Sequence, residues 1–251
     1  MAKPRVAIFD FACCEGCQLQ IINMEEAILD LLNVVQPVEW REAISDHSDE
    51  YDIALVEGSI TRPEDEERLK DIRRRAKILV ALGACATTGG VNKLKNHINS
   101  DELKRCVYGA AAAMPHLDTS PTRSLREIVK VDVEVHGCPM STREFVNVVR
   151  CLATGTTPVT PNYPVCVECK MRETICRYEY NEVCLGIITR AGCDAPCPAG
   201  GQWCFGCRGL VDDPNVNAAN DIMAKYGRTA DDLRRRMELF NSTEARPCPR
   251  Q

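Results

Sequence analysis

Cysteine is the residue type in this sequence that can do the most chemistry. The chain has sixteen cysteines in 251 residues, and eight of them lie in one short stretch. Their spacing is Cys166-x2-Cys169-x6-Cys176-x7-Cys184, then Cys193-x3-Cys197-x6-Cys204-x2-Cys207. The eight thiols divide into two groups of four, and four thiolates are the usual ligands of a 4Fe-4S cluster or of a zinc ion. The stretch therefore predicts two metal centres.

Four more cysteines stand near the carboxyl ends of apolar runs earlier in the chain. They are Cys14 and Cys17 in Cys14-Glu15-Gly16-Cys17, Cys85 in Gly83-Ala84-Cys85-Ala86, and Cys138 in Gly137-Cys138-Pro139. The carboxyl ends of parallel strands meet at one edge of a sheet, so we expect these thiols to converge there. The neighbouring glycines let the backbone approach a bulky group closely.

We call these four cysteines the first set. The second set is Cys166, Cys169, Cys176 and Cys184, and the third set is Cys193, Cys197, Cys204 and Cys207.

The amino terminus indicates whether the protein is exported, and export decides whether the thiols form disulfides, because disulfides form mainly in oxidising compartments. The apolar run Val6 to Phe9 is far too short for the core of a signal peptide, and no cleavage region follows it. No stretch reaches the roughly 18 apolar residues of a membrane span. We therefore expect a cytoplasmic protein without a membrane span, whose thiols stay reduced and available as metal ligands.

Zinc and iron-sulfur clusters both remain possible on spacing alone. The irregular spacing of the second and third sets lacks the regular paired knuckles of a zinc ribbon. A row of redox centres also gives a reason for three sites in one chain, whereas three zinc ions would only add stability. For Cys85 and Cys138 a simpler alternative is that they are small buried residues at strand ends.

Four cysteines fall outside the three sets. Cys13 is adjacent to Cys14 and competes with it, but neighbouring residues that leave a strand point in opposite directions, and we prefer the Cys14/Cys17 pair. Cys151 lies on a helical pattern and is expected to pack. Cys106 and Cys248 have no local motif and are assigned no role.

The first 155 residues alternate between strand and helix patterns. Continuous or alternating apolar runs predict strands at residues 6–9, 53–56, 78–82 and 131–135. Helical periodicity follows at residues 21–32 and 145–152, the latter after the cap candidates Ser141 and Thr142, and a third helix begins near Pro63. These patterns predict an α/β domain built on a parallel sheet.

The amino-acid composition and the hydrophobic pattern change near Gly155. Residues 156–164 form a proline-studded linker, and residues 165–210 have few large apolar side chains. We expect inorganic clusters to substitute there for a hydrophobic core. Thr229 to Asp232 resembles a helix cap, and Leu233, Met237 and Phe240 form the apolar stripe of a closing helix. The chain thus divides into domains 1–155 and 156–251.

Composition excludes one class of partner. The formal net charge is -5, with 27% charged and 45% hydrophobic residues. No excess of positive charge favours nucleic acid, so we expect none to bind.

Four motifs in order resemble the small-subunit signature of nickel-iron hydrogenases. They are Cys14-Glu15-Gly16-Cys17-Gln18-Leu19-Gln20, Val56-Glu57-Gly58-Ser59, Gly83-Ala84-Cys85-Ala86 and Gly137-Cys138-Pro139. The runs Cys184 to Cys193 and Cys204 to Gly209 are similar to the cytosolic group 3 branch, which includes the sulfhydrogenases and the methyl-viologen-reducing enzymes of methanogens. The likeness covers residues 5 to 240.

The resemblance implies a flavodoxin-like domain followed by a small irregular cluster-binding domain with helices at its end. It implies three 4Fe-4S clusters: a proximal one on the first set, a distal one on the second set and a medial one on the third set. Exported relatives have a histidine in place of Cys166 and a proline in place of Cys197. Glu57 would lie close to the proximal cluster, or serve only to cap or solvate a strand end.

By the same resemblance, this chain has no catalytic residue of its own. The nickel-iron site would lie on a partner large subunit, and this chain would pass electrons to an acceptor of flavin/NAD(P), ferredoxin or heterodisulfide reductase type. One alternative is the cluster subunit of a respiratory complex, whose relatives carry a tandem pair like Cys13-Cys14 but lack the eight-cysteine domain. Another is a zinc-stabilised interaction module.

Overall fold

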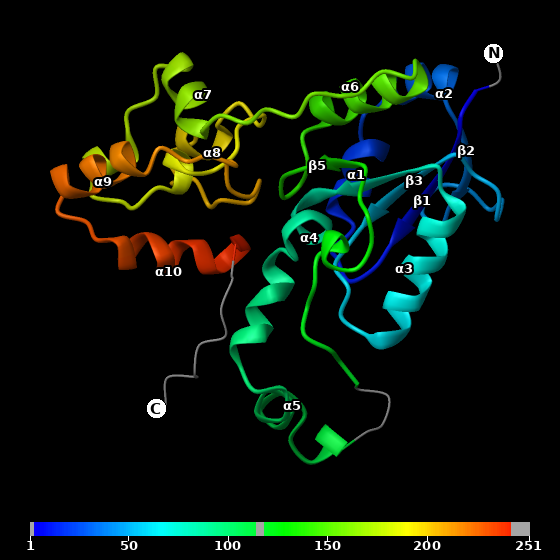
Figure 1. Cartoon of the computed structure of the whole chain (residues 1–251), viewed down its shortest axis with the longest axis horizontal. Coiled ribbons are helices and arrows are strands. Elements are labelled where there is room, and N and C mark those ends of the chain that lie inside the picture. The colour runs from blue at the N-terminus through cyan, green and yellow to red at the C-terminus, as the bar shows by residue number, and fades with distance from the viewer. Residues whose placement is uncertain (1–2, 114–117, 242–251) are drawn as a thin grey trace.

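A five-stranded parallel sheet forms the centre of the first region of the chain (Figure 1). The structure, a computed structural model, describes residues 3–113 and 118–241. The strands are β1 (Arg5–Asp10), β2 (Gln36–Trp40), β3 (Ile53–Glu57), β4 (Ile78–Leu82) and β5 (Val133–Val135). Their order is β2-β1-β3-β4-β5, which is the flavodoxin-like order. The predicted α/β fold is confirmed.

Helices connect the strands and continue into the second region. They are α1 (Gly16–Ile22), α2 (Ala27–Val34), α3 (Pro63–Arg75), α4 (Gly83–Thr88), α5 (Ser100–Tyr108), α6 (Thr142–Ala153), α7 (Val165–Met171), α8 (Pro196–Ala199), α9 (Val216–Lys225) and α10 (Ala230–Asn241). Short 3-10 helices include η1 (Val91–His97), η5 (Arg177–Tyr180) and η6 (Leu185–Ile187).

Both faces of the sheet are buried, as the continuous apolar strands predicted. Val6 and Ile8 of β1 face α1, α2 and α6, whereas Ala7 between them faces α3 on the other side. This alternation follows from the two-residue period of a strand. Because helices cover both faces, the carboxyl edge of the sheet is left to build a site.

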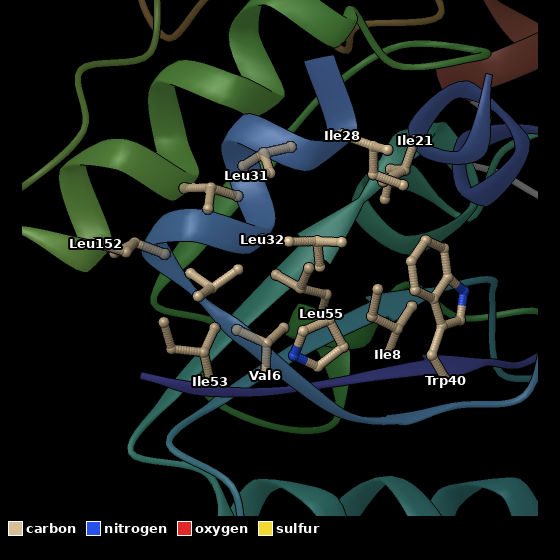
Figure 2. Close-up of a pocket in the computed structure, with 13 residues that line it drawn as sticks. Val6, Ile8, Ile21, Ile28, Leu31, Leu32, Trp40, Ile53, Leu55 and Leu152 are labelled. Atoms are coloured by element: carbon tan, nitrogen blue, oxygen red, sulfur yellow. The ribbon is translucent and has the colours of Figure 1, made fainter. Parts of the chain in front are cut away.

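The packing between the sheet and α2 leaves one small apolar cavity of about 40 Å³. Figure 2 shows Ile28, Leu31 and Leu32 from α2 above Val6 and Leu55 from the strands. The cavity is lined by aliphatic side chains, Pro37 and Trp40, and belongs to the core of the sheet region.

Three local features differ from the sequence prediction. Strand β2 was not predicted, because its segment mixes polar residues with Pro37 and lies at the sheet edge, where proline is tolerated. The helix expected over residues 21–32 is two helices, broken where Glu25 has a φ of 53°. The strand expected over 131–135 begins only at Val133, because the Asp132 carboxylate accepts the Leu79 amide at 2.9 Å beside the ladder.

The predicted helix ends are confirmed. The Ser141 side chain accepts the Glu144 amide at the start of α6, and Pro63 opens α3. Thr229 and Asp232 bond reciprocally at the start of α10. These caps satisfy amides that the first turn of a helix leaves unpaired.

The second region begins after α6 and contains little regular structure. No strand or helix lies between α6 and α7, and residues 172–215 carry only short helical turns. Helix α10 returns to contact η1 and α4 of the first region. The domain boundary at residue 155 stays a prediction.

Candidate functional site

The first set lies at the carboxyl edge of the sheet. Cys14 is in the turn between β1 and α1, and Cys17 is in the first turn of α1. Cys85 is in α4, which begins directly after β4, and Cys138 follows β5. Three distant segments therefore bring their thiols to the carboxyl ends of β1, β4 and β5.

These segments touch one another at a position where only glycine fits. Gly83 has a φ of +77°, and a methyl group there would lie 2.3 Å from Cys17 Sγ and 3.3 Å from the Gly137 carbonyl oxygen. The next amide, that of Ala84, donates to the same carbonyl at 2.7 Å. The start of α4 thus packs directly against the loop that carries Cys138.

The thiols of the first set also interact electrostatically. Burial, followed by the charges on Cys138 and Cys14, raises the pKa of Cys85 to about 12. Burial raises the pKa of Cys17 as well, with contributions from Glu57 and Cys85. These thiols hold their protons unless a metal displaces them, so metal loading would release protons.

Cys13 lies beside the same site. Burial, ahead of the charges on Glu57 and Cys85, raises its pKa to about 12. Its side chain is half-buried, whereas that of Cys14 is exposed, so the two neighbours point into different surroundings. The preference for Cys14 as a ligand stays a prediction.

The second set gathers around α7. Cys166 and Cys169 lie on this helix, Cys176 precedes η5, and Cys184 precedes η6. Burial, followed by the three other thiols of the set, raises the pKa of Cys166 to about 12. A methyl group on Gly186 would lie 3.5 Å from Cys184 Sγ and 3.6 Å from Cys166 Sγ, so the backbone of η6 borders the site closely.

The third set lines a single cavity of about 300 Å³. All four of its cysteines border this cavity, together with Cys138 of the first set and the side chain of Arg208. Cys204 is buried, and burial raises the pKa of Cys207 to about 12, followed by the charges on Cys193 and Cys138. The cavity is therefore a compartment surrounded by thiols, which suits a cluster with four cysteine ligands.

Two contacts join the sets to one another. Cys138 borders the cavity that the four cysteines of the third set line, which connects the first set to the third. The Cys204 amide donates to Cys184 Sγ at 3.2 Å, which connects the third set to the second. Amide hydrogen bonds to sulfur are among the features that tune iron-sulfur centres.

Comparison with known families identifies the sheet region. A family model described as "NADH ubiquinone oxidoreductase, 20 Kd subunit" matches residues 14–152, which is more than half of the chain and contains the whole first set. The chain belongs to this family.

The chain is also similar to subunits of hydrogenases. It is 37% identical to the delta subunit of sulfhydrogenase 2 from Pyrococcus furiosus, over 87% of this chain and 92% of the relative. It is 29% identical to a subunit of the F420-non-reducing hydrogenase vhu from Methanocaldococcus jannaschii, over 94% of this chain and 93% of the relative. The resemblance to hydrogenase small subunits is confirmed.

A solved structure supports the same family assignment. The crystal structure of an NAD+-reducing [NiFe]-hydrogenase in the H2-reduced state contains a chain with a TM-score of 0.58 and 30% identity. The match covers 64% of this chain and 96% of that chain.

Glu57, which belongs to one of the family motifs, has a definite structural role. This buried carboxylate accepts the amides of Cys17 and Gln18, each at 3.1 Å, in the first turn of α1. It therefore caps α1, because Glu15 at the N-cap position of that helix provides no side-chain cap. Burial raises the pKa of Glu57 despite these bonds. The sequence suggested a capping role without indicating that α1 was the partner.

The cysteines outside the three sets lie elsewhere, apart from Cys13. Cys106 is exposed on α5, Cys151 is half-buried on α6, and Cys248 lies outside the described residues. The cysteines in the described part of the chain are all free of disulfides. Within the same residues, no three Cys, His, Asp or Glu side chains are arranged to hold a single metal ion.

Across residues 3–113 and 118–241, no helix has both the length and the apolar composition to cross a bilayer.

Proposed function

We propose that this chain is the electron-transfer small subunit of a nickel-iron hydrogenase and that each cysteine set holds one 4Fe-4S cluster. The first set would hold the proximal cluster, the third set the medial one and the second set the distal one. The similarity to hydrogenase subunits and the thiol-lined cavity support this proposal. When bound, such clusters supply one-electron redox centres whose potentials depend on hydrogen bonds to sulfur, charge and exposure.

The observation that carries the proposal is the pair of contacts between sets. Cys138 belongs to the first set and borders the cavity of the third set. Cys204 offers its thiol to the third set and its amide to Cys184 of the second set. The third set is thus linked to each of the other two, which supports the order first, third, second along the proposed row of clusters.

Exposure of the thiols favours the same order. Cys14 and Cys138 are exposed in the first set, and Cys176 is exposed in the second set. The third set has no exposed member, as expected for the middle of a row. We infer that the large subunit, which carries the H2-splitting nickel-iron site, covers the first set, and that an electron-acceptor subunit approaches the second set.

We assign different clusters to the two regions of the chain. Residues 1–155 would position the proximal cluster, and residues 156–251 would hold the medial and distal clusters. No residue of this chain takes part in splitting H2, so its role is to hold, shield and connect the redox centres. A cytoplasmic location stays a prediction from the sequence.

The test is purification of the native complex under anaerobic conditions. Mass spectrometry should identify a large subunit with two C-x2-C pairs, together with the acceptor chain. On addition of H2, the visible absorption of oxidised iron-sulfur clusters should bleach. In a Cys138→Ser variant, H2 should reduce the remaining clusters far more slowly, whereas the Cys151→Ser control should behave as the wild type.

Two results would contradict the proposal. Zinc in place of iron in the purified chain would make it a structural module. Iron-sulfur clusters that H2 never reduces, in a complex without such a large subunit, would favour a respiratory-type cluster subunit instead.

A further inference from the structure

Arg208 directly follows the last cysteine of the third set and is almost completely buried, with 1% of its surface exposed. A buried guanidinium needs hydrogen-bond acceptors for its donors. Arg208 Nε donates to the Ala191 carbonyl at 2.8 Å, and Nη1 donates to the His136 carbonyl at 2.6 Å. Nη1 and Nη2 also donate to the Glu144 carboxylate at 2.7 and 2.9 Å.

The acceptors come from three segments that carry or support the sets. Ala191 lies two residues before Cys193, and His136 lies two residues before Cys138. Glu144 lies in the first turn of α6, whose start is fixed by the Ser141 cap. One side chain therefore ties the third set to both the first set and the sheet region.

The chain leaves room for this guanidinium. Gly192 has a φ of +116°, and a methyl group there would lie 2.4 Å from Arg208 Nη2 and 2.9 Å from Cζ. The Ala191-Gly192-Cys193 segment consequently packs its backbone against the charged group. On the other side, the Gly192 amide donates to the buried Glu168 carboxylate at 2.8 Å.

The guanidinium also borders the compartment of the third set. Arg208 lines the thiol-lined cavity, whereas Glu144, its ion-pair partner, does not. Its hydrogen bonds to Ala191, His136 and Glu144 fix the position of this cation on the wall of the cavity that the four proposed ligands line.

We propose that Arg208 is a positioning residue that holds the third set against Cys138, and that its charge raises the reduction potential of the cluster on that set. Reduction adds negative charge to a cluster, and a nearby buried cation stabilises the reduced form more than the oxidised form. We expect the effect at the cluster of the third set, because Arg208 lines the cavity that the cysteines of this set surround. This inference rests on the proposed function.

The test uses potentiometric titration of the purified complex, followed by electron paramagnetic resonance, together with iron analysis. Arg208→Gln removes the charge but keeps two hydrogen-bond donors, and Arg208→Lys keeps the charge. The control is Arg190→Gln, because Arg190 is a partly buried arginine that donates to the Pro161 and Leu210 carbonyls and lines a different cavity.

We expect full iron content in all three variants. In Arg208→Gln, one of the reduction potentials should fall while the others stay at the wild-type values. Arg208→Lys should restore that potential, and Arg190→Gln should change none. An unchanged set of potentials in Arg208→Gln, or an equal shift of every potential, would overturn the inference.

A second variant keeps the test decisive if Arg208→Gln fails to accumulate with its iron. Glu144→Gln retains the cation and removes its counter-charge, so the same single potential should rise; no shift in this variant would overturn the inference equally. These outcomes differ from a failure of the proposed function, which would appear as missing clusters in the wild-type complex.

Discussion

The buried interiors of the two regions of this molecule differ in the side chains that compose them. In the sheet region, aliphatic side chains on both faces form two large buried clusters. In the second region the apolar clusters are small, and Cys184 and Cys204 are themselves among the buried members. The contrast indicates that the first region carries its own core, whereas the second region is organised around sulfur and depends on what the sulfurs bind.

The largest expected effect is the loss of folded structure in the second region when iron is removed. Treatment of the complex with an oxidant and a chelator should raise amide hydrogen exchange at Leu185 and Val211, whose amides bond the Cys204 and Ile188 carbonyls. Amides of the central strands β1, β3 and β4 should stay protected, because their aliphatic core remains. Mass spectrometry of peptides from both regions measures this difference.

Chelator without oxidant is the control and should leave both regions protected. Continued protection of Leu185 and Val211 after complete iron loss would mean that the second region has a sufficient core of its own. The contrast between the regions would then be wrong.

Cys14→Ser should remove a cluster without unfolding the sheet region. We expect a loss of about four irons per chain, the content of one 4Fe-4S cluster. Circular dichroism of the helices and strands should stay close to wild type, since Cys14 is exposed and lies outside the aliphatic clusters. The neighbouring Cys13→Ser variant is the matched control and should keep all its iron; the reverse pattern would make Cys13 the ligand.

Cys197→Pro should have a smaller effect within the second region. Cys197 lies in the first turn of α8, where the amide is not needed by the helix, so proline is tolerated there. We expect the middle cluster to become a 3Fe form with a new signal in electron paramagnetic resonance of the oxidised protein. If no such signal appears, Cys197 is not the fourth ligand of the third set.

Leu79→Ala should destabilise only the sheet region. Leu79 is fully buried in β4, and such a truncation costs about 2–5 kcal/mol. Thermal unfolding should begin at a lower temperature, while the iron content at low temperature stays at the wild-type value. Iron loss at low temperature would show that the two regions are not independent in the way proposed.

The smallest effect is expected from Asp132→Asn, at about 1 kcal/mol. Burial raises the pKa of Asp132, but the Leu79 amide and the Arg73 guanidinium outweigh it, so the net pKa lies below the ordinary value of 3.8. A depressed pKa contributes stability above pH 3.8 that is lost as the pH falls further. Chemical denaturation at pH 7 and pH 3 should therefore give a smaller difference between variant and wild type at the lower pH.

The sequence predicted the parts of the fold that depend on local pattern. The apolar runs at 53–56 and 78–82 gave two central strands, and Pro63 and Ser141 marked two helix starts, because these signals lie within a few residues. The edge strand β2 and the break near Glu25 escaped prediction, since they depend on neighbours in space. Periodicity continued across the break and gave no warning of it.

The candidate site also has features that the sequence predicted and features that it could not predict. The strand ends predicted that the first set would lie at the carboxyl edge of the sheet, and it does; that each set binds a cluster stays a prediction. The role of Arg208 could not be predicted, because its partner Glu144 lies 64 residues away and its burial depends on contact between the regions. An arginine after Cys207 carries no signal by itself in the sequence.

The most direct test of this account is metal and sulfide analysis of the chain purified anaerobically in its native complex. The account predicts about twelve irons and twelve inorganic sulfides per chain, the content of three 4Fe-4S clusters, with no stoichiometric zinc. Zinc in place of iron, or iron for only one cluster in an intact chain, would contradict it.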